Sequence, residues 1–231
     1  EFAKKWMDIQ SKEFQRLGVC GNFANPYTTM TYAAEASIAN EMGKFLLNGG
    51  LYRGSKPVMW SVVEKTALAE AEIEYEDHKS TTIYAKFNVK ETNFEEIKGA
   101  NVVIWTTTPW TMPGNRAVAF SKNINYVLLK ITKTDENSLA MINQKIIIAK
   151  DLLKEVTHNC KIIEWEELLE IKGEKFQDVV LSHPLSDHGY THDVRMLPAE
   201  FVTVDQGTGF VHIAPGHGED DYFLGKQYNI E

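Results

Sequence analysis

Residues 105–116 read WTTTPWTMPGNR, and residues 207–222 read GTGFVHIAPGHGEDDY. In the first segment, three threonine hydroxyls follow an apolar run, which is typical of the end of a buried β-strand. In the second, an imidazole and several carboxylates surround a glycine-rich turn. Taken singly, each segment has a purely structural explanation, as a β-branched strand end or as the acidic first turn of a helix. Together they indicate a site built from hydroxyl, imidazole and carboxylate groups.

Length and composition are those of one sizeable globular domain. The chain has 231 residues, of which 43% are hydrophobic and 24% charged, so it can bury a substantial core. Its sequence has no apolar run of membrane-spanning length and no signal peptide, and we expect a cytoplasmic protein. Cys20 and Cys160 lie far apart and lack metal-ligand spacing, which fits a reducing compartment.

The charge balance and the two ends of the chain add two expectations. A net charge of −8 argues against a generic nucleic-acid binder, which would carry a basic surface. The chain begins with Glu1, within an apparent amphipathic helix, and stops one residue after Ile230. We therefore expect a piece of a longer enzyme.

Two N-terminal segments have apolar residues at helical spacing followed by glycine. These are Phe2, Trp6 and Ile9 before Gly18, and Ile38, Met42, Phe45 and Leu46 before Gly49 and Gly50. We expect residues 1–54 to form a helical connecting segment and residues 55–231 a β domain, the whole chain being one compact unit. Short helices are also expected at 151–157 and 218–228.

The rest of the chain is predicted to consist mostly of strands. In Ala67–Glu76, apolar residues alternate with glutamates, which favours a strand with an acidic face over a helix. Residues 83–89 alternate likewise and would pair with it across a turn near 77–80. Further strands are expected at 101–108, 116–120, 125–132, 145–149, 160–164, 176–182, 201–204 and 208–213. This predicts a mainly β fold with a closed or nearly closed β-barrel and peripheral helices.

Several segments resemble one family. Residues 17–23 (LGVCGNF), 25–30 (NPYTTM), 56–61 (KPVMWS) and 66–72 (TALAEAE), with the two segments quoted first, resemble the isoleucyl-tRNA synthetases of class I, bacterial or organellar in type. The resemblance covers nearly the whole chain and points to their editing domain, a hydrolase inserted in the catalytic domain. The valyl and leucyl relatives share the layout and stay as alternatives. They normally have Arg in place of Thr108 and lack the Pro-Gly-His-Gly turn.

One departure from the family concerns metal binding. Many bacterial members have a Cys-x-x-Cys pair just after the Trp of the Lys-Pro-Val segment, where this chain has Ser61 and Glu64. A thiolate zinc site cannot form from these residues. We expect no metal and no cofactor in this chain, whereas the resemblance implies that the longer enzyme uses ATP and Mg²⁺.

The resemblance also implies a reaction and its residues. The domain would hydrolyse mischarged valyl-tRNA(Ile), and valyl-adenylate is a second expected substrate. Such a reaction is needed because an isoleucine pocket cannot strongly reject valine, a limit described for this very family. By this resemblance, the threonines Thr106, Thr107 and Thr108 line the site, and Asn115 helps to place substrate and water. Asp221 would hold the α-ammonium, and His212 would limit the size of the side chain. Lys56 would take part in substrate handling at the entry strand. The partners would be the acceptor end of tRNA(Ile) and the rest of the synthetase chain, with no membrane and a monomeric state.

Each of these roles has a structural alternative. Asp221 could be only a first-turn helix residue, His212 a core histidine, and Asn115 a turn former. His217 is expected to shape the turn, and Trp105 and Trp110 to pack.

Two further function classes would require different motifs. A non-catalytic module that binds the tRNA acceptor end would keep aromatic and basic residues and lose the Thr–His–Asp set. A complete synthetase would need His-Ile-Gly-His-type and Lys-Met-Ser-Lys-Ser-type signatures, and neither occurs in the sequence, nor does a phosphate-binding Gly-x-x-x-x-Gly-Lys. The editing reaction therefore accounts for the motifs better than either.

Overall fold

The computed structural model describes residues 1–230. Backbone contacts group the chain into two compact units, Glu1–Ser55 and Lys56–Glu231. None of the helices within the described residues combines the length and the apolar character that crossing a membrane requires.

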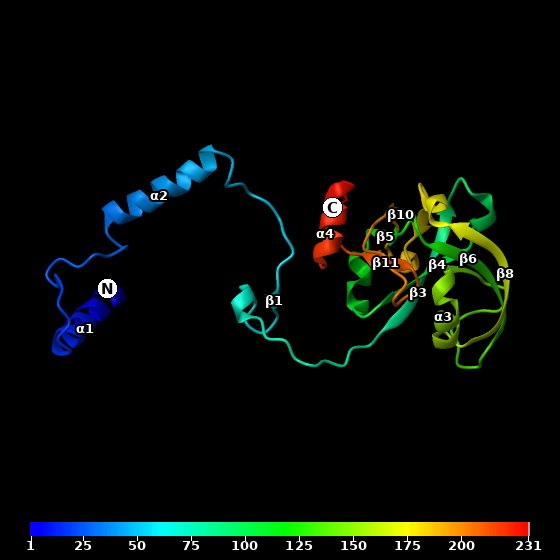
Figure 1. The fold of residues 1–231 in the computed structure, drawn as a ribbon, viewed down its shortest axis with the longest axis horizontal. Coiled ribbons are helices and arrows are strands. Elements are labelled where there is room, and N and C mark those ends of the chain that lie inside the picture. The colour runs from blue at the N-terminus through cyan, green and yellow to red at the C-terminus, as the bar shows by residue number, and fades with distance from the viewer. Residues whose placement is uncertain (231) are drawn as a thin grey trace. The chain divides into compact units, whose positions relative to one another are not determined.

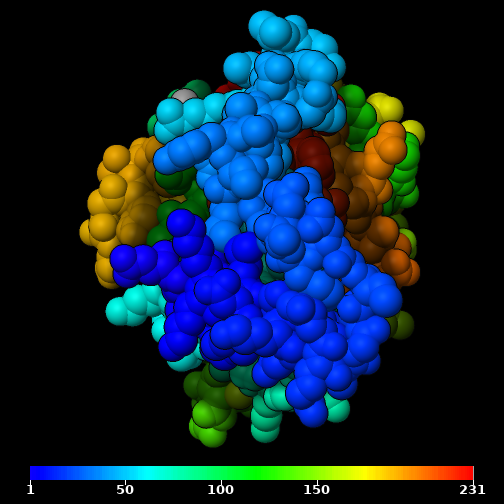
Figure 2. Space-filling view, turned by 90° about the vertical axis from the view of Figure 1, so that its left-hand side faces the viewer, coloured from blue at the N-terminus to red at the C-terminus, as the bar shows by residue number. Residues whose placement is uncertain are grey.

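The first unit contains two helices, α1 (Phe2–Arg16) and α2 (Tyr32–Leu47), which confirms both predicted helices. Gly18 and Gly49 follow them with positive φ angles of 80° each, a backbone conformation that glycine adopts without strain. The hydroxyl of Thr31 caps α2 by accepting a hydrogen bond from the backbone N–H of Ala34. Neither helix has a buried residue, and Figure 2 shows their side chains, in blue, at the surface.

The second unit is mainly β (Figure 1). Its strands are β1 (Trp60–Ser61), β2 (Thr66–Ala67), β3 (Ile83–Glu91), β4 (Asn101–Thr106), β5 (Ala117–Phe120), β6 (Asn125–Thr134), β7 (Lys145–Ala149), β8 (Ile162–Lys172), β9 (Val180–Ser182), β10 (Asp193–Pro198) and β11 (Phe210–Ile213). Its helices are α3 (Leu153–Asn159) and α4 (Glu219–Gln227), and its 3₁₀ segments are η1 (Glu70–Glu72), η2 (Glu95–Ile97), η3 (Pro109–Gly114), η4 (Lys150–Leu152), η5 (Gly173–Phe176) and η6 (Ser186–His188).

Nine of these strands form one sheet in the order β11-β5-β10-β9-β3-β4-β7-β6-β8, while β1 and β2 pair separately. Most neighbours are antiparallel, but β5 runs parallel to β10, and β4 runs parallel to β7. In β5 and β11, Val118 lies opposite His212, so the strand that carries this histidine is fixed by β5.

The prediction was a closed or nearly closed barrel. The closed form is not found, because the order of the described strands has two ends, β11 and β8. The sheet instead curls so that the start of β11 approaches β6 and β7. The backbone N–H of Ala149 donates to the carbonyl of Thr208 (2.7 Å), and the hydroxyl of Tyr126 donates to the carbonyl of Gly209 (2.8 Å). A Cβ at Gly209 would lie 2.4 Å from the Cβ of Ala149, so only glycine fits this approach.

Aromatic rings fill the core behind β11. Tyr126 of β6 stacks on Phe210 of β11 with ring centroids 4.5 Å apart. Phe176 of η5 meets Tyr126 edge-on at 4.9 Å and Phe210 at 5.3 Å. All three side chains are buried, and contacts of this kind contribute beyond simple area burial. The cluster therefore fixes the start of β11, two residues before His212.

The predicted strand at 67–76 is wrong. Only its first residue lies in a strand, β2, and η1 follows, closed by a hydrogen bond from Ala69 N to the carboxylate of Glu72 (2.8 Å). The expected partner, β3, is paired on both sides by β4 and β9 instead. The alternating apolar residues thus have no sheet face to cover, and Tyr75 is 86% exposed.

Other differences concern bounds. The strands expected at 101–108, 116–120, 125–132, 145–149 and 208–213 form, as do the helices near 151–157 and 218–228. Residues 201–204 form no strand, β8 extends to Lys172, and β9 starts at Val180. No strand was predicted at 193–198, where β10 forms with charged Asp193 and Arg195 alternating with buried Val194 and Met196.

Candidate functional site

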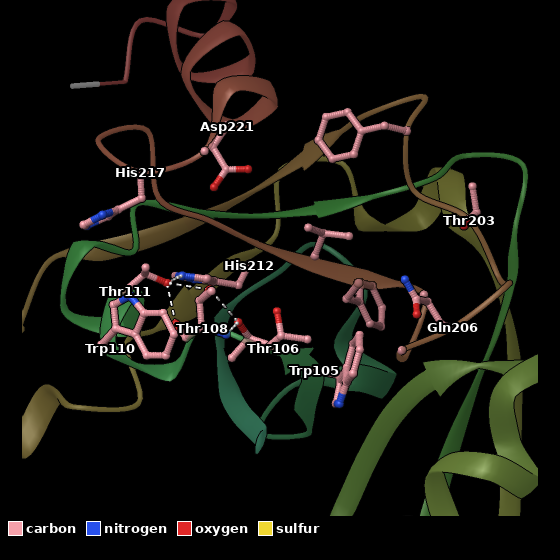
Figure 3. Close-up of a pocket in the computed structure, with 17 residues that line it drawn as sticks. Trp105, Thr106, Thr108, Trp110, Thr111, Thr203, Gln206, His212, His217 and Asp221 are labelled. Atoms are coloured by element: carbon pink, nitrogen blue, oxygen red, sulfur yellow. Dashed lines mark hydrogen bonds between the residues drawn. The ribbon is translucent and has the colours of Figure 1, made fainter. Parts of the chain in front are cut away.

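A cavity of about 570 Å³ lies where β4 ends, β11 passes and α4 begins. Five of the residues singled out from the sequence line it, namely Thr106, Thr107, Thr108, His212 and Asp221. Figure 3 shows the threonines and His212 on one side, with the carboxylate of Asp221 pointing toward the same space from the first turn of α4. Segments about 100 residues apart in sequence therefore meet in one pocket.

The threonine segment turns sharply after β4. The hydroxyl of Thr106 accepts a hydrogen bond from the backbone N–H of Thr108 (3.1 Å), and the two hydroxyl oxygens are 3.3 Å apart. Thr106 is buried, Thr108 is half-buried, and Thr107 is exposed. Thr106 thus holds the turn, while Thr108 is placed to present its hydroxyl to the cavity.

His212 is held at both ring nitrogens. The amide Nδ2 of Asn115, which can only donate, lies 2.8 Å from its Nδ1, so Nδ1 accepts. Its Nε2 must then carry the proton and donates to the hydroxyl of Thr111 (2.9 Å), which in turn donates to the carbonyl of Thr108 (2.8 Å). This chain of hydrogen bonds fixes one neutral tautomer and one ring orientation.

Burial keeps His212 neutral. The side chain is buried in the pocket wall, and burial lowers its pKa to about 4, with a smaller contribution from the neighbouring imidazoles of His183 and His217. With both nitrogens engaged and a pKa this low, His212 is a poor general base at neutral pH. It can instead act as a rigid, uncharged part of the wall.

Asn115 does not line the cavity. It is fully buried, and its Nδ2 also donates to the carbonyl of Ala117 (2.8 Å). Its Oδ1 is buried without a hydrogen-bond partner among the described residues, which costs free energy. The opposite orientation of the amide would lose the hydrogen bonds that Nδ2 donates. The direct role in placing substrate and water, which the family resemblance implies, stays a prediction. Among the residues that line the cavity, Asn115 contacts His212.

Asp221 is fixed by the turn before α4. Its Oδ2 accepts a hydrogen bond from the backbone N–H of Ala214 (2.8 Å), which leaves Oδ1 for another donor. Burial raises the pKa of this carboxyl, and the Ala214 hydrogen bond opposes that rise. A Cβ at Gly218 would lie 2.8 Å from Cγ of Asp221, so the turn needs glycine there.

Lys56 is not brought to the cavity. Its exposed ammonium lies 3.9 Å from the exposed carboxylate of Glu219, a contact that stabilises little in water. Ser61 and Glu64, which replace the family's cysteine pair, hydrogen-bond to each other within the turn between β1 and β2. Among residues 1–230, no cluster of three His, Cys, Asp or Glu side chains could hold a metal ion.

The sequence reasoning missed part of the lining. Thr111 lies three residues after Thr108 and was not singled out, although that spacing puts the two hydroxyls within 3.5 Å in a 3₁₀ turn. Trp105 and Trp110, expected to pack, line the cavity, and Trp110 is 65% exposed. His217 belongs to the turn, as expected, and also to the lining.

The arrangement limits the chemistry that the pocket can perform. Hydroxyls and the neutral imidazole of His212 lie on one side, and the partly buried carboxylate of Asp221 and the imidazole of His217 come from the turn and helix start on the other. Such a pocket suits a small substrate with a cationic group and a water molecule placed by hydroxyls.

Several relatives of this chain are isoleucine–tRNA ligases. The ligase of Pelagibacter ubique (strain HTCC1062) is 50% identical over 231 residues, which cover 100% of this chain and 25% of the relative. That of Gluconobacter oxydans (strain 621H) is 48% identical over 233 residues, with 100% and 24% covered. The resemblance found in the sequence is confirmed, and the chain spans about a quarter of the length of these relatives.

The fold is also that of a solved synthetase domain. The editing domain of the P. knowlesi cytosolic leucyl-tRNA synthetase aligns with a TM-score of 0.52 at 15% identity, covering 65% of each chain. At this identity the likeness concerns the fold alone, and it agrees with the mainly β architecture. The family model described as tRNA synthetases class I (I, L, M and V) matches residues 1–211. The chain therefore belongs to the class I tRNA synthetases (I, L, M and V).

Proposed function

We propose that this chain is the editing region of an isoleucine–tRNA ligase and that its pocket hydrolyses valyl-tRNA(Ile). The observation that carries the proposal is the meeting of hydroxyls, a neutral histidine and a partly buried carboxylate in one cavity of about 570 Å³. The relatives' names support the isoleucine system. Valyl-adenylate, which carries the same aminoacyl group, is a second substrate of the same proposal.

The reaction adds one water to an activated ester. The water oxygen bonds to the carbonyl carbon of the aminoacyl group, and the bond from that carbon to the ribose oxygen breaks. One water proton passes to the ribose oxygen, giving free valine and uncharged tRNA. Because the ester is already reactive, a placed water and hydrogen bonds to the developing charge are sufficient. The hydroxyl of Thr108 is our candidate for placing the water, with Thr107 beside it.

The α-ammonium of the aminoacyl group would bind Asp221. Oδ1 of this carboxylate is left over once Oδ2 accepts from Ala214. A charge-assisted hydrogen bond there is worth about 1.5–3 kcal/mol. A side chain fixed by its own turn needs no reordering before it binds, which favours a productive position of the ester.

Selection against isoleucine must be steric. Apolar burial would favour isoleucine by about 0.8 kcal/mol per methylene, so attraction alone selects the wrong substrate. A rigid wall reverses this preference, because overpacking costs about 1–3 kcal/mol. His212 is our candidate wall, since hydrogen bonds to Asn115 and Thr111 prevent its ring from turning aside. In this account Asn115 acts through His212.

The remaining partners follow from the same proposal. The acceptor end of tRNA(Ile) would deliver the ester, and most of the affinity for this acidic chain would come from elsewhere in a longer, monomeric ligase that uses ATP and Mg²⁺. Lys56 lies outside the cavity, so its proposed role is limited to contact with the incoming nucleic acid.

The test is deacylation of valyl-tRNA(Ile) by this chain and by the longer ligase that we propose contains it. Both Thr108→Val and Thr108→Ser should fold, since the first keeps the branched shape and the second keeps the hydroxyl. We expect valine release to fall by about tenfold to a hundredfold in the valine variant and to stay near normal in the serine variant. Valine release no faster than in buffer, from chain and ligase alike, would refute the proposal.

A further inference from the structure

The loop between β9 and β10 begins and ends with a histidine. Ser182 pairs with Asp193 across the two strands, so His183 and His192 lie at the base of this loop, with their ring centroids 5.1 Å apart. Neither residue lines the pocket described above. Both side chains nevertheless reach the segment η3, which carries Thr111 and precedes Asn115.

His183 is fixed on every side. It is 1% exposed, its ring stacks on Tyr190 at 5.1 Å, and its Nδ1 accepts the backbone N–H of Leu185 (3.0 Å). The opposite nitrogen, Nε2, must then carry the proton, and it donates to the carbonyl of Met112 (2.9 Å). A buried residue from the loop thus holds the backbone of η3 near its middle.

His192 holds the other end of the same segment. Its Nε2 donates to the carbonyl of Asn115 (2.9 Å), which also accepts from the guanidinium of Arg116 (3.0 Å). The side chain of Asn115 is the group that fixes Nδ1 of His212. A shift of the Asn115 backbone would therefore move the amide that orients His212.

The segment η3 needs such external support. It contains Pro109 and Pro113, which have no backbone N–H, and its short 3₁₀ turns have weaker geometry than an α-helix. Two backbone hydrogen bonds join η3 to the residues that flank it, Thr111 N to Thr108 O and Asn115 N to Met112 O. The position of its side chains therefore depends on contacts with residues outside η3, such as those of His183 and His192.

We propose that His183 and His192 are positioning residues for the editing pocket. Their hydrogen bonds to the carbonyls of Met112 and Asn115 fix η3 and the position of the His212 ring, and thereby the selectivity between valyl and isoleucyl esters. This inference rests on the proposed function. It predicts a change in selectivity, not merely in stability, when either of these two hydrogen bonds is removed.

The experiment compares His183→Leu and His192→Phe with His188→Leu in the full ligase. His188 lies exposed in the same loop and is the matched control. We expect the ratio of valyl to isoleucyl hydrolysis to fall about three- to tenfold in both test variants and not in the control. His183→Gln keeps a hydrogen-bond donor near the Nε2 position and should keep most of the valyl-to-isoleucyl ratio of the unaltered enzyme. His192→Phe affects a half-buried side chain, so the test stands even if His183→Leu fails to fold.

A second readout does not depend on activity. Ring ¹⁵N NMR of His212 should show the single Nε2–H tautomer in the unaltered protein, with two widely separated nitrogen signals. In the test variants the two signals should move toward each other as the second tautomer becomes populated. Folded variants that keep both the selectivity ratio and the His212 signals would overturn the inference. If valyl-tRNA is not hydrolysed at all, the proposed function fails. The NMR result alone then decides whether His183 and His192 position His212.

Discussion

Asp221 and Asp220 are neighbours with different surroundings. Asp221 lines the cavity and holds Ala214 N, whereas Asp220 is exposed in the same helical turn. Sequence alone left open whether Asp221 was only a first-turn residue of α4, because carboxylates favour that position in any helix. In the structure Asp221 accepts a hydrogen bond from Ala214 N and lines the cavity, and its binding of an ammonium group stays a prediction.

The matched substitution at this position is Asp221→Asn. Asparagine can still accept from Ala214 N, so the turn should survive while the charge that faces the ammonium is lost. We expect kcat/KM for valyl-tRNA(Ile) to fall by about tenfold to a hundredfold, with little change in melting temperature. Asp220→Asn is the control and should remain near normal. Equal losses in the two variants would remove Asp221 from the binding role.

Strands were predictable where an apolar pattern also had a surface to pack on. The strands β4 to β7 have strongly apolar patterns and form as expected, while α1 and α2 form from their helical spacing alone, without a buried residue. The pattern at 67–76 is equally periodic, but β3 has no free edge for it. β10 was not predicted although its buried residues alternate with charged ones, because it lies in a stretch of histidines and its parallel pairing with β5 is a property of the whole sheet.

The site shows the same division. Thr106–Thr108, His212 and Asp221 could be taken from the sequence because each stands in a family motif, and all line the cavity. The contacts of Asn115 and Thr111 with His212 join residues about 100 positions apart in sequence, and no local pattern predicts them. The spacing of Thr111 from Thr108 is a local signal, but it does not show that Thr111 reaches His212.

The turn before α4 gives a prediction for an element. Gly218→Ala would place a Cβ 2.8 Å from Cγ of Asp221, which must then move away from Ala214 N. Overpacking of this kind costs about 1–3 kcal/mol, and we expect a matching fall in melting temperature together with reduced valine release. Gly216→Ala is the control, since a Cβ there meets nothing within 4 Å. Indistinguishable variants would show that the turn tolerates the added methyl group.

At the scale of the whole molecule, buried neutral histidine links stability to pH. The pKa of His212 is about 4 in the folded protein and about 6.5 in an unfolded chain. Between these values the unfolded state binds more protons, so the stabilising contribution is fully present above pH 6.5 and is lost as the pH falls toward 4. It amounts to about 3 kcal/mol at most. Burial lowers the pKa of His183 as well, which acts in the same direction.

Urea denaturation between pH 4 and 7 measures this linkage. The free energy of unfolding should decrease as the pH is lowered from 6.5, and His212→Gln should show a shallower decrease because it removes one of the two histidines whose pKa burial lowers. Parallel pH curves for the two proteins would mean that His212 titrates normally in the folded state.

The most direct measurement of the central claim is hydrolysis of valyl-tRNA(Ile) and isoleucyl-tRNA(Ile), side by side, by the full ligase and its His212→Ala variant. The unaltered enzyme should release valine and leave the isoleucyl ester intact, because the fixed imidazole excludes the larger side chain. In the variant the wall is gone, and both amino acids should be released. A variant that leaves isoleucyl-tRNA(Ile) as stable as the unaltered enzyme does would contradict the account, and His212 would then be a buried histidine of the core.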